Sequence, residues 1–234
     1  MGADGTSTAN IDKVAEDIVL EYLRKIEANV IVISEEVGMI EITPEAEDII
    51  YLDPIDGTFN TRSNIPIYAL SLAYASKGTL MRAFISNLAT GEIFTADKGK
   101  GAMKDGASLN ISNTTKMHDA SFALYINQEE EAIKQIAPLF ASIRRIRHFG
   151  ASALELAYVA AGGLDAYIDL RGKLRITDAA AGLLLCTEAG GIVTTPDGNL
   201  LSFPDTIQSG ASIIASNGYL HDKIISLITN TEER

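Results

Sequence analysis

Hydrophobic residues recur along the first half of the chain at two spacings, which predict one helix followed by a run of strands. Between residues 9 and 28 they lie three or four positions apart, the period of an amphipathic helix. Beyond it, β-branched runs predict strands at residues 29–34, 48–52, twice between 67 and 87, and at 92–95, with loops at 38–44 and 99–106. The tight turns between the later runs are typical of an antiparallel meander.

Helices and strands alternate in the second half. Strands are predicted at residues 121–126, 143–147, 166–170, 191–194 and 211–215, and helices at 129–140, 152–161, 178–189 and 219–229. A meander followed by an alternating half favours an α/β (α+β) fold of layered helices and sheets. A TIM barrel is disfavoured because it alternates from its first strand.

The composition excludes several classes of protein. One cysteine and three scattered histidines allow neither an internal disulfide nor a structural zinc site. The 234 residues carry 31 acidic and 19 basic side chains, a formal charge of −12, with no block of five basic residues. We therefore expect no nucleic-acid partner and no binding to anionic membranes. Without a long apolar stretch or a secretory signal, the protein is expected to be cytoplasmic.

Carboxylates gather where the first two predicted strands end. Asp53 and Asp56 follow the second strand in a turn that Pro54 stiffens, and Glu35-Glu36 ends the first strand. If the strands are neighbours, their carboxylates lie close together, which is costly unless a divalent cation offsets the charge. Oxygen ligands favour Mg²⁺ or Mn²⁺ over Zn²⁺. An isolated motif of this kind is more often an ordinary turn.

Two further acidic residues each have a simpler explanation when taken alone. Asp178 lies at the start of a predicted helix, where capping is the default role of an aspartate. Asp12 lies on the first predicted helix, where plain solvation is the default. A role for Asp12 and Asp178 in metal binding or catalysis is therefore suggested only by the family resemblance described next.

Together these segments resemble the signature segments of the inositol monophosphatase family. The matching segments are Glu35-Glu36 and residues 51–60 (YLDPIDGTFN), 97–102 (DKGKGA), 162–167 (GGLDAY), 177–183 (TDAAAGL) and 187–191 (TEAGG). The order agrees from about residue 4 to the end. Residues 2–6 and 169–177 are similar to the archaeal branch, whose members often hydrolyse both inositol monophosphates and fructose 1,6-bisphosphate. The resemblance implies a layered α-β-α-β-α sandwich of the sugar-phosphatase type.

The resemblance also implies a set of metal ligands and catalytic residues. The first metal site matches Glu35, Asp53 and the carbonyl of Ile55, and the second matches Asp53, Asp56 and Asp178. Thr58, with Asp12 behind it, matches the pair that orients the attacking water, and Glu35 is also counted as catalytic. The amides of Gly57 and Thr58, together with Asp56, match the phosphate site. Two or three Mg²⁺ ions are implied, with Mn²⁺ as a substitute and lithium as an inhibitor.

The substrate side matches less closely. Gly150, Ala151 and Ser152 fall on the segment that lines the leaving group, and Asp169 falls where the family binds substrate hydroxyls. The stretch between Asp169 and Asp178 is longer than in the animal enzymes. Two arginines in it are candidates for reading a second phosphate, Arg171 and Arg175.

The resemblance further implies how the chain is organised. Residues 1–118 would form a half with the antiparallel sheet and most metal ligands, and residues 119–234 a half that supplies Asp178 and the substrate pocket, within one catalytic unit. A sugar or polyol phosphate substrate and a homodimer are expected. The family has a helix ahead of the segment with which this sequence opens, and residues 1–9 match a mobile loop near the metals.

Two alternatives stay open. A 3′-nucleotide bisphosphate phosphatase would share every metal ligand and differ in the pocket. A non-catalytic sugar-phosphate-binding scaffold of the same fold would be expected to lose ligands, whereas all of them are present here. A third feature, the basic run Arg144 to Arg147, is interpreted as a solvated strand edge.

Overall fold

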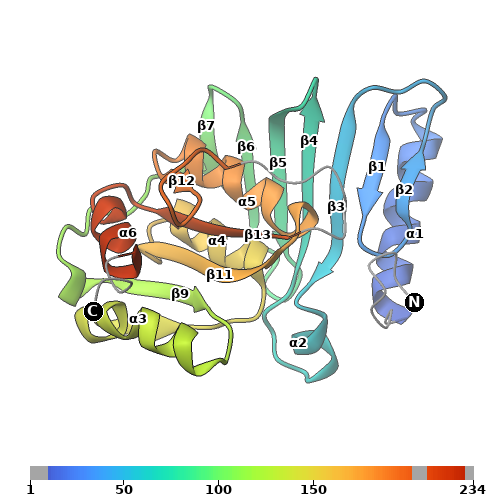
Figure 1. Cartoon of the computed structure of the whole chain (residues 1–234). Coiled ribbons are helices and arrows are strands. Elements are labelled where there is room, and N and C mark those ends of the chain that lie inside the picture. Colours follow the sequence, from blue (N-terminus) through green and yellow to red (C-terminus); the bar gives the residue numbers. More distant parts are fainter. Residues whose placement is uncertain (1–9, 202–209, 230–234) are drawn as a thin grey trace.

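The computed structural model describes residues 10–201 and 210–229, which form five layers (Figure 1). Helix α1 lies outside an eight-stranded sheet, α4 and α5 lie between this sheet and a five-stranded one, and α3 and α6 cover the far face. The predicted α-β-α-β-α sandwich is therefore confirmed. The helices are α1 (Asn10–Lys25), α2 (Thr58–Arg62), α3 (Glu130–Ser142), α4 (Ser152–Ala160), α5 (Ile176–Glu188) and α6 (His221–Thr229), with a 3₁₀ turn, η1 (Met117–Asp119).

The larger sheet has the order β2-β1-β3-β4-β5-β6-β7-β8, and all pairs are antiparallel except β1 with β3. Its strands are β1 (Ile31–Ser34), β2 (Gly38–Glu41), β3 (Ile49–Asp56), β4 (Ala69–Ser76), β5 (Thr79–Asn87), β6 (Ile93–Asp97), β7 (Gly101–Lys104) and β8 (Ala107–Ser108). The predicted meander is confirmed by the antiparallel pairing of β4 with β5 and of β5 with β6. Every second residue of β4 is buried, as expected of a strand between two layers.

The smaller sheet has the order β10-β9-β11-β13-β12 and mixes parallel with antiparallel pairs. Its strands are β9 (Ser121–Tyr125), β10 (Arg145–Arg147), β11 (Ala166–Leu174), β12 (Ile192–Thr194) and β13 (Ala211–Ser216). Strand β10 lies at the edge, where Arg144, Arg145 and Arg147 are exposed, as predicted for a solvated edge.

Two short strands contradict the predicted loops, and one short helix was not predicted. Strands β2 and β7 occupy segments that were expected to be connections, and α2 directly follows the aspartate turn. Strands β2 and β7 have four residues each and begin with glycine, so they exist because a neighbouring strand pairs with them and not through their own propensity. Strand β11 also runs four residues past its predicted end.

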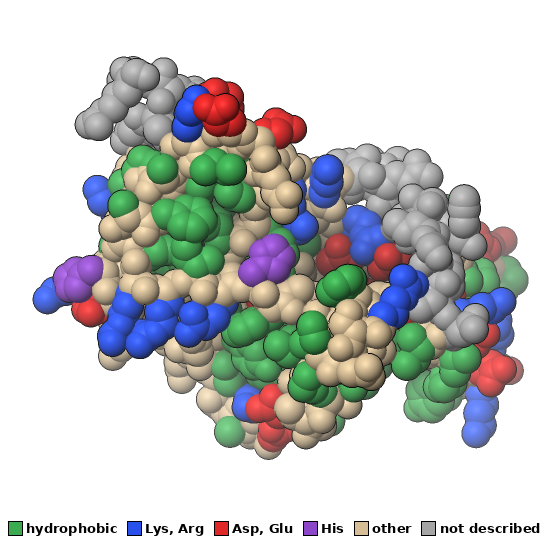
Figure 2. Space-filling model, turned by 90° about the horizontal axis from the view of Figure 1, so that it is seen from below, with side chains coloured by type: hydrophobic (Ala, Val, Ile, Leu, Met, Phe, Trp, Pro, Cys, Tyr) green, Lys and Arg blue, Asp and Glu red, His purple; other side chains and the backbone are tan. Residues whose placement is uncertain are grey.

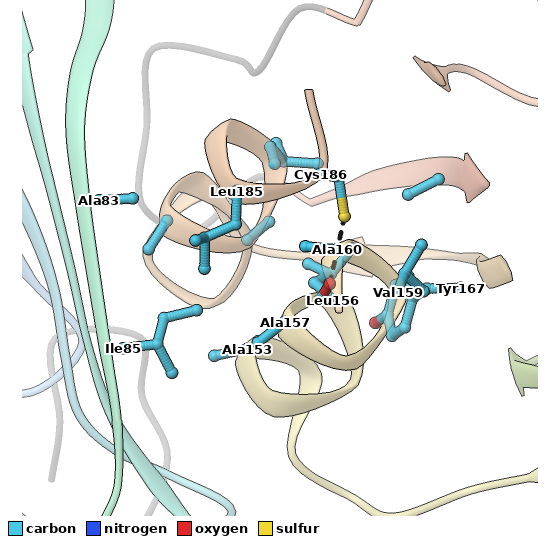
Figure 3. Packing of buried hydrophobic residues seen from close by; sticks show 14 of the residues in the cluster. Ala83, Ile85, Ala153, Leu156, Ala157, Val159, Ala160, Tyr167, Leu185 and Cys186 are labelled. Atoms are coloured by element: carbon cyan, nitrogen blue, oxygen red, sulfur yellow. Dashed lines mark hydrogen bonds between the residues drawn. The ribbon is translucent and has the colours of Figure 1, made fainter. Parts of the chain in front are cut away.

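The core between the sheets depends on small residues. Figure 3 shows Ala83 and Ile85 of β5 facing Leu185 of α5 and Ala153 of α4. Where the two helices approach, a Cβ on Gly182 would lie 2.4 Å from the Cβ of Leu156, so no larger residue fits without movement. Such close packing fixes α5 against α4, and α5 also packs on β5 of the larger sheet, which carries the aspartate turn.

Buried Cys186 belongs to this packing. Its Sγ donates to the carbonyl of Leu156 at 3.2 Å, and burial raises the pKa of the thiol to about 12. A thiol this buried and this weakly acidic is a structural residue.

Helix α1 covers only part of the outer face of the larger sheet. A groove of about 720 Å³ lies between Ile18 and Tyr22 of α1 and apolar side chains of the sheet that include Leu72 and Phe84. None of the described helices has both the length and the apolar character needed to cross a membrane.

Candidate active site

The carboxylates predicted from the sequence meet at the ends of β1 and β3. These strands pair in parallel with Ser34 opposite Leu52, so the next residues, Glu35 and Asp53, emerge side by side. Parallel strands bring their carboxyl ends to one edge of the sheet, and this is why two segments 18 residues apart supply neighbouring acids.

Asp178 joins these two acids from α5. One carboxylate oxygen from each of Glu35, Asp53 and Asp178 lies within 4.8 Å of the others. The N-cap residue of α5 is Arg175, so Asp178 lies in the first turn and is not the cap that its sequence position suggested. We call these three residues the acidic cluster.

The acidic cluster is electrostatically costly. Burial, followed by the charges of Asp56, Glu35 and Asp178, raises the pKa of Asp53 well above its usual value. Figure 2 shows a recess in the face seen from below where acidic and basic side chains lie together. An all-oxygen cluster in which like charges resist ionisation fits a hard divalent cation, which lets every carboxylate stay ionised.

Arg175 supplies the positive charge that the structure contains at this point. Its Nη1 lies 2.7 Å from Oε1 of Glu35, and its Nη2 lies 3.1 Å from Oδ1 of Asp178. These carboxylates raise the pKa of the guanidinium above its ordinary value against the opposing effect of burial. Arg175 thus bridges two of the predicted metal ligands.

Asp56 has a different environment from Asp53, although both belong to one turn. Its carboxylate accepts hydrogen bonds from the amides of Ser152 (3.1 Å) and Ala153 (2.7 Å), at the N-terminus of α4. Burial and Asp178 raise its pKa, while the two amides act in the opposite direction. Asp56 therefore caps a helix 96 residues further along and lies beside the acidic cluster.

The turn between Asp56 and α2 requires glycine. Gly57 has φ 95°, and a Cβ there would lie 2.9 Å from the carbonyl oxygen of Ile67. Thr58 opens α2, and its Oγ1 donates to the carbonyl of Ile55 at 3.1 Å. The Ile55 carbonyl, one of the predicted ligands, keeps a second lone pair for another partner.

Helix α1 contributes buried acids from behind the cluster. Asp12 is buried, so the default expectation of a solvated residue is wrong. Glu16, one helical turn later and missed by the sequence analysis, accepts hydrogen bonds from Ser34 Oγ and from the amide of Val37 (3.3 Å). Its i+4 spacing from Asp12 on a half-apolar helix was the available signal. Glu16 holds the end of β1, next to Glu35.

The residues predicted for the substrate side form a second polar group. Asp169 is fully buried and is gripped by Arg171 through Nε (3.0 Å) and Nη2 (2.5 Å). Ser152 Oγ accepts from the hydroxyl of Tyr167 at 3.0 Å. Ala151 is buried and Gly150 is exposed, so in this segment Gly150 offers its surface to solvent. The bidentate pair leaves Asp169 already engaged within the protein.

A comparison of the sequence with family models decides the class of protein. The model described as the inositol monophosphatase family matches residues 3–233. The chain belongs to the inositol monophosphatase family. The predicted phosphatase class is thereby confirmed, because this is a family of phosphatases.

Individual relatives agree with this family. The chain is 37% identical over 97% of its length to a fructose-1,6-bisphosphatase/inositol-1-monophosphatase of Methanothermobacter thermautotrophicus, of which it covers 85%. It is 36% identical over 98% of its length to a bifunctional NADP phosphatase/NAD kinase of Methanocaldococcus jannaschii, of which it covers 45%. A crystal structure named inositol monophosphatase-fructose 1,6 bisphosphatase superposes with a TM-score of 0.88 at 32% identity, over 97% of this chain and 87% of that one.

Proposed function

We propose that this member of the inositol monophosphatase family is a cytoplasmic, Mg²⁺-dependent phosphomonoesterase acting on inositol monophosphate, fructose 1,6-bisphosphate or both. The observation that carries the proposal is the acidic cluster, in which three segments distant in sequence direct carboxylates at one point. The names of the relatives support the substrate class.

In this proposal the acidic cluster holds the cations, with Asp56 and the Ile55 carbonyl as further oxygen ligands. Two or three Mg²⁺ ions, or Mn²⁺, are expected. When bound, such ions polarise a phosphoryl oxygen and lower the pKa of coordinated water. Cation binding is expected to displace Arg175, because its guanidinium contacts both oxygens of Glu35 and both oxygens of Asp178.

The neighbouring residues position the reactants. Thr58, already held by the Ile55 carbonyl, is proposed to orient the attacking water together with Asp12, and the amides of Gly57 and Thr58 are proposed to contact the phosphate. No covalent phosphoenzyme is needed, since the work is positioning and charge stabilisation. Residues 1–118 and 119–234 would then act as two halves of one catalytic unit.

On the substrate side, Gly150, Ala151 and Ser152 are proposed to line the leaving group. Arg171, held by Asp169, and Arg175, once released, would face a second anionic group of the substrate. This favours a bisphosphate over a substrate with a single phosphate. The relative named as an NADP phosphatase supports testing a nucleotide as well, the alternative of a 3′-nucleotide bisphosphate phosphatase included.

Initial rates with Mg²⁺ test the substrate class directly. Fructose 1,6-bisphosphate, inositol 1-phosphate, 3′-phosphoadenosine 5′-phosphate and NADP⁺ are compared under the same conditions, with a lithium series on the best substrate. We expect hydrolysis of one or both of the first two, inhibited by lithium. Hydrolysis of a nucleotide alone would favour the alternative, and no hydrolysis would leave the non-catalytic scaffold.

We also propose that the protein is a homodimer. Helix α1 and the residue that follows it expose five large apolar side chains, two of which, Ile18 and Tyr22, line the apolar groove. The other three are Ile11, Val14 and Ile26. A continuous apolar surface of this kind is typical of an interface, and a two-fold axis would bury it against the same surface of a second copy. Analytical ultracentrifugation is expected to give a dimer for the wild type and a monomer for Ile18→Asp. A monomeric wild type would contradict the proposal.

A further inference from the structure

A buried carboxylate outside the acidic cluster is unexplained by the proposed hydrolysis. Glu155, in the first turn of α4, has no exposed surface. Its two oxygens accept hydrogen bonds from the hydroxyl of Tyr125 (2.5 Å) and from the amide of Phe149 (2.6 Å). Burial raises its pKa to about 7. The two hydrogen bonds offset the cost of burying this carboxylate, and they connect it to two neighbouring segments.

The first thing that Glu155 organises is the segment before α4. The Tyr125 hydroxyl that donates to Glu155 also accepts from the amide of Gly150 at 3.0 Å. On the other side, the carbonyl of Phe149 accepts from Asn60 Nδ2 at 2.6 Å. The segment of Phe149 and Gly150 is therefore held between α4 and α2, and it leads into the two amides that bind Asp56.

The second thing is the arginine on the substrate side. The guanidinium of Arg171 lies over the ring of Tyr125, 4.4 Å from the ring centroid. The ring of His148 also contacts that of Tyr125, with 4.0 Å between the centroids. A cation over an aromatic face is held more firmly when the ring itself cannot move. The hydrogen bond to Glu155 fixes the hydroxyl end of that ring.

We propose that Glu155 and Tyr125 form a positioning pair that couples the Asp56-holding end of α4 to Arg171, so that the phosphate side and the leaving-group side of the site keep a fixed separation. This inference rests on the proposed function and adds two residues to it. Neither residue touches a member of the acidic cluster in the contacts described above. The pair should therefore act mainly on substrate binding and turnover, and it should affect cation affinity only through Asp56, the one proposed ligand that α4 holds.

Tyr125→Phe is the sharpest variant, because it keeps the ring under Arg171 and removes only the hydroxyl. We expect kcat/KM for the best substrate to fall about tenfold, because the variant loses the hydrogen bonds of this hydroxyl to Glu155 and from the Gly150 amide, both of which position the segment before α4. Glu155→Gln should act in the same direction. The double variant should lose less than the product of the single losses, since the two residues act as one unit.

Asp165→Asn is the matched control. Asp165 is also a buried carboxylate in the second half, and its oxygens accept from Ser112 Oγ (2.5 Å) and from the amide of Ser121 (2.7 Å). It should lose stability, measured as Tm, and keep kcat/KM within about twofold. Mn²⁺ affinity by titration calorimetry should match the wild type in Asp165→Asn, and in Tyr125→Phe and Glu155→Gln it should fall by less than kcat/KM does. Losses in kcat/KM that match the control would overturn the positioning role.

Hydrogen exchange separates this inference from the proposed function. Amide exchange in residues 148–153 should accelerate in Tyr125→Phe and stay unchanged in Asp165→Asn, whether or not a substrate has been found. Unchanged exchange in Tyr125→Phe would overturn the coupling. A wild type that hydrolyses no phosphate ester, with faster exchange in the variant, would defeat the proposed function alone. Tyr125→Phe also serves where Glu155→Gln fails to fold.

Discussion

The acidic cluster and the N-terminus of α4 both contain buried carboxylates, yet they satisfy them in opposite ways. In the cluster, neighbouring carboxylates repel one another, and the guanidinium of Arg175 is the positive group that contacts them. At α4, the carboxylates of Asp56 and Glu155 are met by amides and a hydroxyl of the protein itself. In the proposed function the first region takes a cation that the chain does not supply, whereas the carboxylates at α4 already have hydrogen-bond donors from the protein. Asp56 belongs to both regions, since α4 holds it and it is also a proposed cation ligand.

Removing an acid from the cluster should have the largest effect. Asp53→Asn is expected to lower kcat/KM by more than about a hundredfold, because a cation loses its most buried ligand. The metal-free Tm should not fall, since like-charge repulsion is relieved, and the rise in Tm with Mn²⁺ should disappear. Thermal unfolding in EDTA measures the metal-free Tm, and thermal unfolding in Mn²⁺ measures the rise in Tm.

Asp165→Asn is the control for Asp53→Asn, and the opposite result is expected for it. It should lose Tm and retain turnover, because both of its oxygens have protein donors. If Asp53→Asn behaved like Asp165→Asn, the distinction between the two kinds of buried acid would be lost.

The glycine that joins the two regions gives the next largest effect. Gly57→Ala combines a positive φ with a contact of 2.9 Å to the Ile67 carbonyl and should cost about 2–3 kcal/mol in the free energy of unfolding. Gly91→Ala, at φ 80° with open space, should cost only about 1 kcal/mol. Urea unfolding of both variants checks the difference, and equal losses would show that the close approach carries no cost.

The ionisation of Glu155 should make stability depend on pH. Its folded pKa of about 7 lies above the ordinary value of 4.5, so folding favours the protonated acid, and the stability this contributes is lost as the pH rises through 7. The wild type should therefore gain on the order of 1–3 kcal/mol over Glu155→Gln between pH 8 and pH 5. Unfolding at both pH values measures the gain, and a constant difference would contradict the shift.

Arg175 should give the smallest effect. Arg175→Gln removes the guanidinium that shares Glu35 and Asp178 with a cation, so Mn²⁺ should bind severalfold more tightly while the metal-free protein loses stability. Arg175→Lys keeps the charge and should stay near the wild type. Titration calorimetry gives the affinities, and weaker binding by Arg175→Gln would mean that the arginine assists the cation.

Sequence reasoning succeeded where local pattern and spatial neighbourhood coincide. The β-branched run before Asp53 predicted a strand, and its parallel pairing with β1 brought Glu35 beside it. The resemblance of the TDAAAGL segment placed Asp178 there as well, although its position on a helix alone favoured a cap. Such strand patterns and short motifs can be recognised in the sequence because each consists of a few adjacent residues.

The parts that sequence reasoning missed depend on contacts between distant residues. Glu155 is the one charged residue in the apolar run 151–163, which indicates burial, but its partner Tyr125 lies 30 positions away and no local pattern links the two. Residues 1–9, which match a mobile loop of the family, lie outside the described residues.

Manganese in a crystal tests the central claim most directly. The account predicts anomalous peaks between Asp53 and Asp178, with Glu35 as a further ligand and Arg175 displaced from its present position. A crystal soaked at saturating Mn²⁺ with no peak there, and with Arg175 still bridging Glu35 and Asp178, would contradict it.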